Sequence, residues 1–366
     1  MKKTILCMLK TDIHDHFFYK VQISELKKLV ESLNYQIVEE IVQTRSKKRS
    51  KFLIGKGKVQ EIKQLIQEQN IESVIFYNTL TSKQKLNLLT ELSGNQEIEI
   101  LDRYELTLKI FEQNASDKLS KIQIQLAQLR KQFPFYKLQA NIKFKQDLPA
   151  RKFGPGEFAF HSKIKSYDKK IAAIRTEIES LKAKKLERIQ KRRKILNGGK
   201  ICCIVGYYNA GKTTLFNLLT GAKKLISDQP FTTLSSKYRR INKNINLILV
   251  DTIGFVIGLD PRLIKSFELN LLDMQNADIL AYLIALDDEL DLINHKLKYG
   301  LELLKDIGID SEKIILIFNK YDLISKQEFE STIQYLEPII SKYRYFCISA
   351  KNKENINDLL SYFEYN

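Results

Sequence analysis

The stretch ICCIVGYYNAGKTTLFNLLT, residues 201–220, decides the fold class of this 366-residue chain. It contains a G-x-x-x-x-G-K-[ST] motif between an apolar run typical of a buried strand and a segment typical of a helix. In that setting backbone N–H groups and the helix N-terminus surround phosphate groups. The Lys212 ammonium then faces the β- and γ-phosphates, and the Thr213 hydroxyl is placed to ligate Mg²⁺. We predict a phosphate-binding loop of Gly206, Tyr207, Tyr208, Asn209, Ala210, Gly211, Lys212, Thr213 and Thr214.

A second set of motifs indicates guanine as the base. An N-K-x-D sequence, Asn319 to Asp322, ends the apolar run 313–318. Its aspartate carboxylate accepts hydrogen bonds from the N1–H and the exocyclic amine of guanine, a donor pair that adenine lacks. We expect Asn319 to bridge to the phosphate loop, the Lys320 stem to cover the base, and Ser349, Ala350 and Lys351 to support it. Ligands bind at the carboxyl ends of strands in a doubly wound sheet, so these motifs together predict a GTP site.

Magnesium and the γ-phosphate require groups outside the phosphate loop. Asp251-Thr252-Ile253-Gly254 follows the apolar run 246–250, and we expect Asp251 to hold Mg²⁺ through water and the Gly254 N–H to contact the γ-phosphate. Residues 227–240 occupy the position of switch I, where a threonine ligates Mg²⁺ and closes over the γ-phosphate. Phe231, Thr232 and Thr233 are the candidates there, and either threonine suits the metal.

The residue after this D-T-I-G motif bears on hydrolysis. Many GTPases place a water-orienting glutamine there, whereas this chain has Phe255, so hydrolysis must be arranged differently. Asn209 offers one route, because an asparagine at this position of the loop ligates K⁺ beside the phosphates in several GTPases that lack the glutamine. The alternative is that Asn209 only holds the loop through a bond to the backbone. We take Lys212, Asn209, Thr233 and Gly254 as the candidate catalytic residues.

The remaining pattern predicts an α/β protein in three parts. Residues 1–116 alternate between short strands and amphipathic helices, which indicates a small parallel α/β domain. Residues 117–197 carry apolar stripes at heptad spacing over 118–133 and 162–196, which indicates an antiparallel helical hairpin with a GPG loop in the connection 134–161. Residues 198–366 form the doubly wound P-loop GTPase domain. The basic segment 45–59 is expected to be an exposed loop.

The charge of the chain is unevenly distributed. Its net charge is +17, yet residues 1–200 hold 41 basic and 22 acidic side chains, whereas residues 201–366 hold 19 and 21. A basic region beside a neutral one suggests that the first part binds nucleic acid. Two interpretations of the basic segment KAKKLERIQKRRK, residues 182–194, remain open: it contacts phosphate groups, or it is a solvated helix end. We expect no signal peptide, no transmembrane segment and no disulfide framework, with Cys202 and Cys203 buried, so the chain is expected in the cytoplasm.

The motifs together resemble the HflX family of ribosome-associated GTPases. GYYNAGKTTLFNLLTG, DQPFTTL, DTIGF, NKYD and SAK are similar to the family's GTPase elements. IGKGKV, LDRYELTLKIF, KIQIQLAQL and GPGE are similar to its N-terminal pattern in the same order. The resemblance places the Mg²⁺ ligand of switch I at Thr233. It implies association with the large ribosomal subunit and its rRNA, dissociation or rescue of ribosomes, and stimulation of GTP hydrolysis by the ribosome. We expect a monomer, because no long apolar stripe remains exposed once the hairpin pairs with itself.

The chain departs from the family pattern in the segment that the family is thought to point into the ribosome. After GPGE the sequence is FAFHSKIKSYDKK instead of a polar, acidic and arginine-rich stretch, and RKQFPFYK replaces a leucine-proline-arginine ending. Ribosome contacts there could be altered. Three alternatives remain open: a GTPase that assembles the large subunit, an RNA-remodelling ATPase with a nucleotide site at GKGK (residues 55–58), and an RNA-binding protein with a vestigial GTPase domain.

Overall fold

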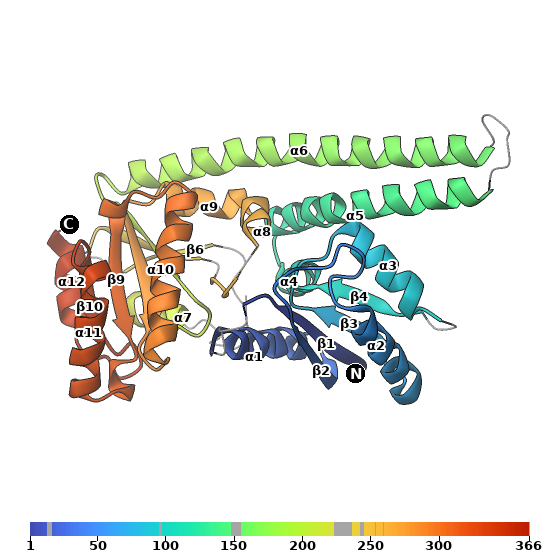
Figure 1. Cartoon of the computed structure of the whole chain (residues 1–366). Coiled ribbons are helices and arrows are strands. Elements are labelled where there is room, and N and C mark those ends of the chain that lie inside the picture. The colour runs from blue at the N-terminus through green and yellow to red at the C-terminus, as the bar shows by residue number, and fades with distance from the viewer. Residues whose placement is uncertain are drawn as a thin grey trace. The chain divides into compact units, whose positions relative to one another are not determined.

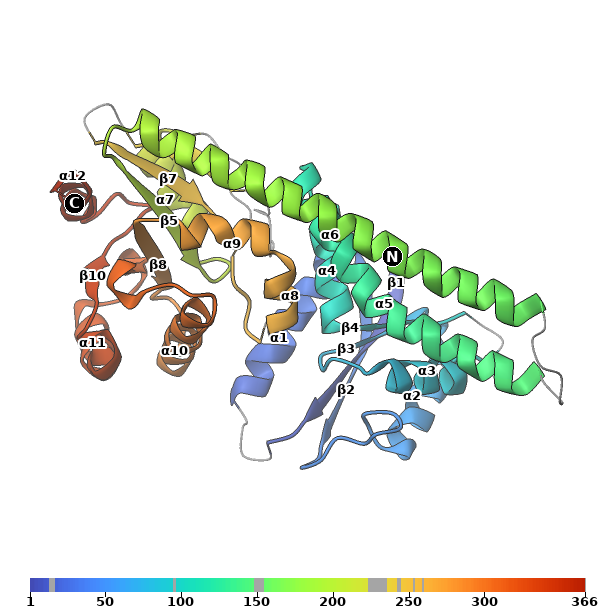
Figure 2. The same ribbon diagram turned by 90° about the horizontal axis from the view of Figure 1, so that it is seen from above.

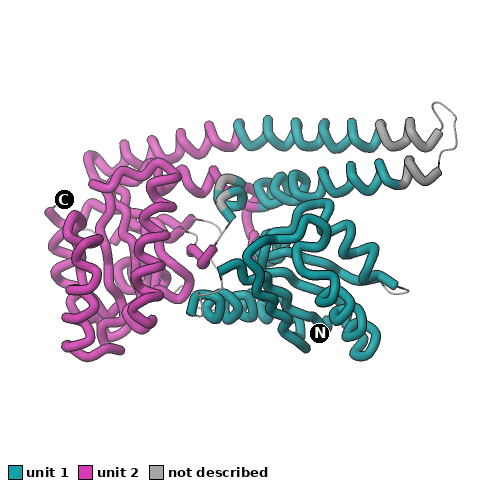
Figure 3. The backbone as a smooth tube through the Cα atoms, in the orientation of Figure 1, with its two compact units in different colours: residues 1–113, 121–179, 260–266 teal, residues 114–120, 180–259, 267–366 magenta. Residues whose placement is uncertain are grey.

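The computed structural model of the chain describes residues 1–12, 17–94, 97–147, 155–222, 236–241, 245–252, 254–258 and 260–365. They divide into two compact units, drawn in teal and magenta in Figure 3. Unit 1 comprises Met1–Gln113, Lys121–Glu179 and Asp260–Ser266. Unit 2 comprises Asn114–Ser120, Ser180–Leu259 and Phe267–Asn366. Both units are α/β, which confirms the predicted fold class.

Unit 1 contains a four-stranded parallel sheet in the order β2-β1-β3-β4 (Figure 1). Its strands are β1 (Lys2–Lys10), β2 (Tyr35–Thr44), β3 (Ser73–Phe76) and β4 (Glu99–Asp102). The helices between and after them are α1 (Phe17–Ser32), α2 (Lys56–Gln69), α3 (Ser82–Leu92) and α4 (Arg103–Asn114). The strands alternate with helices as predicted, because parallel neighbours require a crossover connection.

The segment 45–59 differs from the prediction of an exposed loop. Phe52, Leu53 and Ile54 are buried in the core of unit 1, and α2 already begins at Lys56. Leu53 has a φ of 71°, and its backbone pairs with that of Arg49 across a tight turn. The basic residues on either side dominate the composition of the segment. The burial of three adjacent apolar side chains outweighs that composition, since each contributes about 1.5–3 kcal/mol.

The helical hairpin is present, but its helices are longer than predicted. Helix α5 spans Lys118–Asp147 and α6 spans Pro155–Ile195, and the two lie side by side in Figures 1 and 2. The prediction of a connection over residues 134–161 is therefore wrong, since both helices extend into that range. A proline inside a helix costs about 3 kcal/mol. Helix α5 nevertheless continues through Pro134, where the rings of Phe133 and Tyr136 pack on Tyr167 of α6 at centroid distances of 5.9 and 5.5 Å.

Unit 2 contains a six-stranded sheet in the order β10-β9-β8-β5-β7-β6. Its strands are β5 (Lys200–Gly206), β6 (Lys237–Arg240), β7 (Leu247–Asp251), β8 (Ile279–Ala285), β9 (Ile314–Asn319) and β10 (Arg344–Cys347). Its helices include α7 (Lys212–Thr220), α9 (Glu268–Gln275), α10 (Leu290–Asp306), α11 (Lys326–Ile340) and α12 (Ile356–Tyr365), whereas α8 (Pro261–Ser266) belongs to unit 1. All strand pairs are parallel except β6 with β7, and the sequence did not predict β6.

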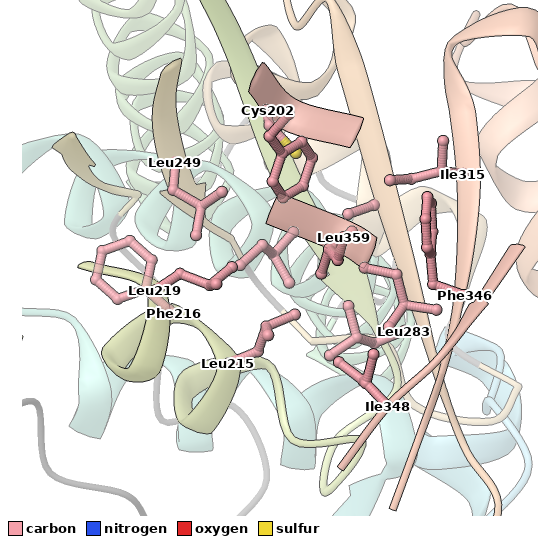
Figure 4. Packing of buried hydrophobic residues seen from close by; sticks show 14 of the residues in the cluster. Cys202, Leu215, Phe216, Leu219, Leu249, Leu283, Ile315, Phe346, Ile348 and Leu359 are labelled. Atoms are coloured by element: carbon pink, nitrogen blue, oxygen red, sulfur yellow. The ribbon is translucent and has the colours of Figure 1, made fainter. Parts of the chain in front are cut away.

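The core of unit 2 lies directly beneath the phosphate loop. Figure 4 shows Leu215, Phe216 and Leu219 of α7 packed with side chains of the central strands, among them Cys202 and Leu249. Cys202 is fully buried, as predicted, and burial raises the pKa of its thiol to about 12. This packing fixes the start of α7 against the end of β5. Within the described ranges, every helix falls short of the length or the apolar character needed to cross a bilayer.

Candidate functional site

The phosphate loop runs from the end of β5 to the first turn of α7. Gly211 caps this helix with a φ of +90°, in the left-handed region that side chains disfavour. A Cβ at this position would lie 2.2 Å from the Asn319 Nδ2 atom. Asn209 also has a positive φ, of 60°, and its side chain is exposed. The loop thus turns sharply before the helix, which leaves the N–H groups of the first turn of α7 open to an anion.

Lys212 and Gly254, which are 42 residues apart, meet at this loop. The Lys212 side chain is only 8% exposed, and its Nζ donates to the Tyr207 carbonyl oxygen at 2.6 Å. A Cβ at residue 254 would lie 2.9 Å from the same Nζ atom. The D-T-I-G backbone and the lysine ammonium therefore occupy neighbouring positions. This juxtaposition places one cation beside the backbone of Gly254, and a cation with a backbone N–H would suit a terminal phosphate.

The backbone after Gly254 is hydrogen-bonded to the phosphate loop. Phe255 N–H donates to the Gly206 carbonyl oxygen, and Tyr208 N–H donates to the Phe255 carbonyl oxygen, both at 2.9 Å. The Phe255 ring is 5% exposed and contacts Tyr207 and Tyr282 at centroid distances of 6.0 and 6.4 Å. The side chain at this position is thus part of the core. It does not face the solvent from which an attacking water would come.

Two oxygen donors suit a magnesium ion at the same end of the sheet. Thr213 lies in the first turn of α7, and Asp251 is fully buried at the end of β7. Residue 251 pairs with Ile204 of β5, and the Thr252 hydroxyl donates to the Ile204 carbonyl oxygen at 2.7 Å. A hydroxyl and a carboxylate are hard ligands of the type that Mg²⁺ prefers. The predicted residues Phe231, Thr232, Thr233 and Ile253 lie outside the described residues.

The predicted base-binding motifs are joined to the phosphate loop by one buried side chain. Asn319 Nδ2 donates to the Ala210 carbonyl oxygen at 2.8 Å, and the Ala350 N–H donates to Asn319 Oδ1 at 3.0 Å. Asn319 therefore connects three loops that are distant in sequence. Ser349 is fully buried and accepts from the Asn352 N–H at 3.0 Å, which shapes the third loop. The two bonds of Asn319 tie the three loops to one another.

Lys320 and Asp322 lie on the rim of this region. Lys320 has a φ of 67°, and its Nζ forms an ion pair with Asp287 at 2.7 Å. Asp322 is half-buried in a short 3₁₀ turn, and Lys351 is exposed. Sequence reasoning missed Asp287, although it closely follows the apolar run 279–286. The ion pair holds the lysine stem along the rim, where it can cover a flat ring.

Comparisons with known proteins support the assignment of both halves. A family described as "GTP-binding GTPase N-terminal" matches residues 20–112, and one described as "50S ribosome-binding GTPase" matches residues 201–320. A protein named GTPase HflX from Thermofilum pendens is 35% identical over 92% of this chain and 78% of its own length. Another of that name from Methanocaldococcus jannaschii is 34% identical over 94% of this chain and 83% of its own. A solved structure titled as the complex of SsGBP and GDP has a TM-score of 0.53 and 27% identity, covering 100% of this chain and 98% of that one.

Proposed function

Because this chain belongs to the HflX family of GTPases, we propose that it couples GTP binding and hydrolysis to association with the ribosome, chiefly the large subunit, and to ribosome dissociation or rescue. One observation carries the proposal: the family match spans both halves of a chain whose excess positive charge lies in residues 1–200. Since rRNA is a dense polyanion, the basic half is suited to contact it, while the neutral half carries the nucleotide site.

The nucleotide would lie across the carboxyl ends of β5, β7 and β9. The backbone of residues 206–211 and the start of α7 would surround its phosphates, with Thr213 and Asp251 beside the β- and γ-phosphates. Asn319, Lys320 and Asp322, with the loop at 349–351, would hold the guanine. When bound, Mg²⁺ supplies positive charge beside the β- and γ-phosphate oxygens. Thr213 and Thr233 are its proposed ligands, with Asp251 acting through water.

Hydrolysis would depend on charge and not on a side chain that orients water. The Lys212 ammonium and the Gly254 N–H would stabilise the negative charge on the γ-phosphate as the bond to the leaving oxygen breaks, and their proximity supports this. Phe255 contributes to the core instead of contacting water. We propose that Asn209, exposed on the loop, helps to hold a K⁺ ion whose charge replaces that of an arginine finger. Thr233 would close over the γ-phosphate.

The division of labour along the chain follows the three predicted parts. Residues 1–116 would dock on rRNA, and residues 117–197 would extend the hairpin towards the active site of the large subunit. Residues 198–366 would bind and hydrolyse GTP. GTP would order Thr233 and Gly254, which would favour the form that separates subunits, and hydrolysis would permit release. The chain would act as a monomer in the cytoplasm.

Sedimentation with purified ribosomes tests the proposal. Wild-type protein and Lys212→Ala would be run with GDP or a non-hydrolysable GTP analogue at two salt concentrations. We expect the wild type with the analogue to travel with large subunits and to deplete whole ribosomes, and we expect Lys212→Ala to do neither. Protein that stays at the top of the gradient in both nucleotide states at low salt would contradict the proposal. Binding to precursor particles alone would support an assembly factor instead.

A further inference from the structure

The last turns of α6 and strand β6 carry a concentration of positive charge that is unusual for unit 2. The α6 segment 182–194 reads KAKKLERIQKRRK, and β6 reads KYRR. The chain from residue 201 onward is almost balanced as a whole, with 19 basic and 21 acidic side chains, β6 included. Two basic elements that are distant in sequence therefore lie within one compact unit. The α6 segment lies outside the nucleotide motifs, and β6 is the end of the segment 227–240 that was expected to contain switch I.

Some of these cations anchor the helix to the domain. Lys185 Nζ forms an ion pair with Asp273 at 2.6 Å and donates to the Leu269 carbonyl oxygen at 2.5 Å. The Tyr238 hydroxyl donates to the same carboxylate, and the Arg192 guanidinium lies 3.6 Å from the Tyr238 ring centroid. The last turns of α6 are thereby held against β6. Such a fixed arrangement is the requirement for one binding surface built from both elements.

Other cations point away from the domain. Lys184, Arg188 and Lys191 follow i, i+4, i+7 spacing and are all exposed, so they form one stripe on α6. Among the described side chains, Lys191 pairs with Glu187 of the same helix, but both are more than half exposed, and such pairs are weak. Arg240 lies on the same side of β6 as Tyr238, because side chains alternate along a strand. Its guanidinium donates to Asn246 Oδ1 at 2.7 Å, and Asn246 Nδ2 in turn donates to the Leu196 carbonyl oxygen just after α6.

We propose that this basic surface, formed by Lys184, Arg188 and Lys191 of α6 and Arg240 of β6, binds the phosphate backbone of double-stranded RNA. The three lysine and arginine positions on α6 are about 6 and 4.5 Å apart along the helix axis. A duplex carries roughly one phosphate per 1.7 Å of its axis, so each cation has a phosphate within reach. A membrane-surface helix would need an apolar face turned outward. This stripe instead consists of charged residues, and Ile195 at its end is the one large apolar side chain that is exposed among the described side chains of α6.

This inference goes beyond the proposed function and rests on it only in taking RNA as the partner. The test is the affinity of the full-length protein for a fluorescent 20-base-pair RNA duplex, measured by anisotropy between 50 and 200 mM KCl. The variant Lys184→Gln/Arg188→Gln/Lys191→Gln keeps good helix formers. The control variant removes the same charge from exposed positions elsewhere in unit 2, namely Lys305→Gln/Lys342→Gln/Lys353→Gln. GDP binding and circular dichroism establish that each variant is folded.

We expect the α6 triple variant to bind the duplex at least ~10-fold more weakly at 100 mM KCl and to lower the slope of log K against log salt by about 2–3. Arg240→Gln alone should lower that slope by about 1. The control triple should leave both close to wild type. An equal loss of affinity in the two triple variants would overturn the proposal. Wild-type protein that does not bind the duplex would overturn it too. Tighter binding to phosphatidylserine vesicles than to RNA would do so as well. Co-sedimentation of the α6 variant with ribosomes is measured in a separate experiment, so failure of this inference can be distinguished from failure of the proposed function.

Discussion

Replacing Asn319 with alanine should weaken binding of GDP and GTP to a similar extent. The wild-type side chain is buried, accepts from the Ala350 N–H at 3.0 Å and donates to the Ala210 carbonyl oxygen at 2.8 Å. Alanine leaves both backbone groups without these partners, at about 1–3 kcal/mol each. Because the loops carrying Ala210 and Ala350 flank the predicted phosphate and base positions, part of this energy is lost from binding. We expect the free energy of nucleotide binding to fall by about 1.4–2.8 kcal/mol, which raises Kd by ~10- to 100-fold.

The assay is titration of a fluorescent GDP analogue, followed by competition with GTP, at saturating Mg²⁺. Asn276→Ala is the matched control, because its Nδ2 donates to the Leu272 carbonyl oxygen within one helix and touches no predicted nucleotide loop. The control should change Kd by less than about threefold. If Asn319→Ala binds GDP as tightly as the control does, the bridge supports only the fold and the reasoning is refuted. Weaker binding of GTP alone would equally refute it, since the bridge does not involve the γ-phosphate.

Four further results are expected. Asp273→Asn breaks the buried ion pair with Lys185 and should lower the free energy of unfolding by about 3 kcal/mol in urea titration, whereas Glu330→Gln, in an exposed pair, should lower it by less than about 0.5. Phe255→Gln should not accelerate GTP hydrolysis in a phosphate-release assay, since the side chain at this position is buried. The same change should lower the free energy of unfolding by about 2–4 kcal/mol. Faster turnover would contradict the assignment of this side chain to the core. The Cys202 thiol, whose pKa is raised to about 12, ionises above about pH 9 only after unfolding, so the folded state then holds more protons and stability falls as pH rises. Cys202→Ala should flatten this decline by about 1.4 kcal/mol per pH unit between pH 9.5 and 10.5. GTP hydrolysis should be faster in KCl than in NaCl at equal ionic strength, and equal rates would remove the potassium hypothesis.

Elements with strong local signals were predictable from the sequence. Helix α3 is one of the amphipathic helices expected within residues 1–116, and it begins at Ser82 because Thr81 and Gln84 form a capping box. The inner strands of the two sheets lie close to the predicted apolar runs for a similar reason, since an inner parallel strand is buried on both faces and its sequence is largely apolar. Local chemistry is sufficient where it agrees with the tertiary environment.

Features that depend on distant partners were not predictable. Strand β6 consists of KYRR, which has no apolar alternation, and it exists because β7 offers a free edge to pair with. Helix α5 passes through Pro134 where its aromatic residues contact Tyr167, a contact outside any local window. The burial of residues 52–54 likewise depends on the core of unit 1. In each case a long-range interaction outweighs a local preference.

The site shows the same division, and it carries a consequence for how hydrolysis is controlled. Motifs located the positions of Lys212, Gly254 and Asn319, but only the structure shows that Phe255 is held by two backbone hydrogen bonds and two aromatic rings. Turning the ring towards the nucleotide would break its two aromatic contacts and expose it to solvent, at a cost of about 1.5–3 kcal/mol. The position after Gly254 is therefore unsuited to orient water, which agrees with the proposal that positive charge beside the γ-phosphate promotes hydrolysis. Under the proposed function we expect slow turnover of the isolated protein and faster turnover when ribosomes are added, and a phosphate-release assay checks this.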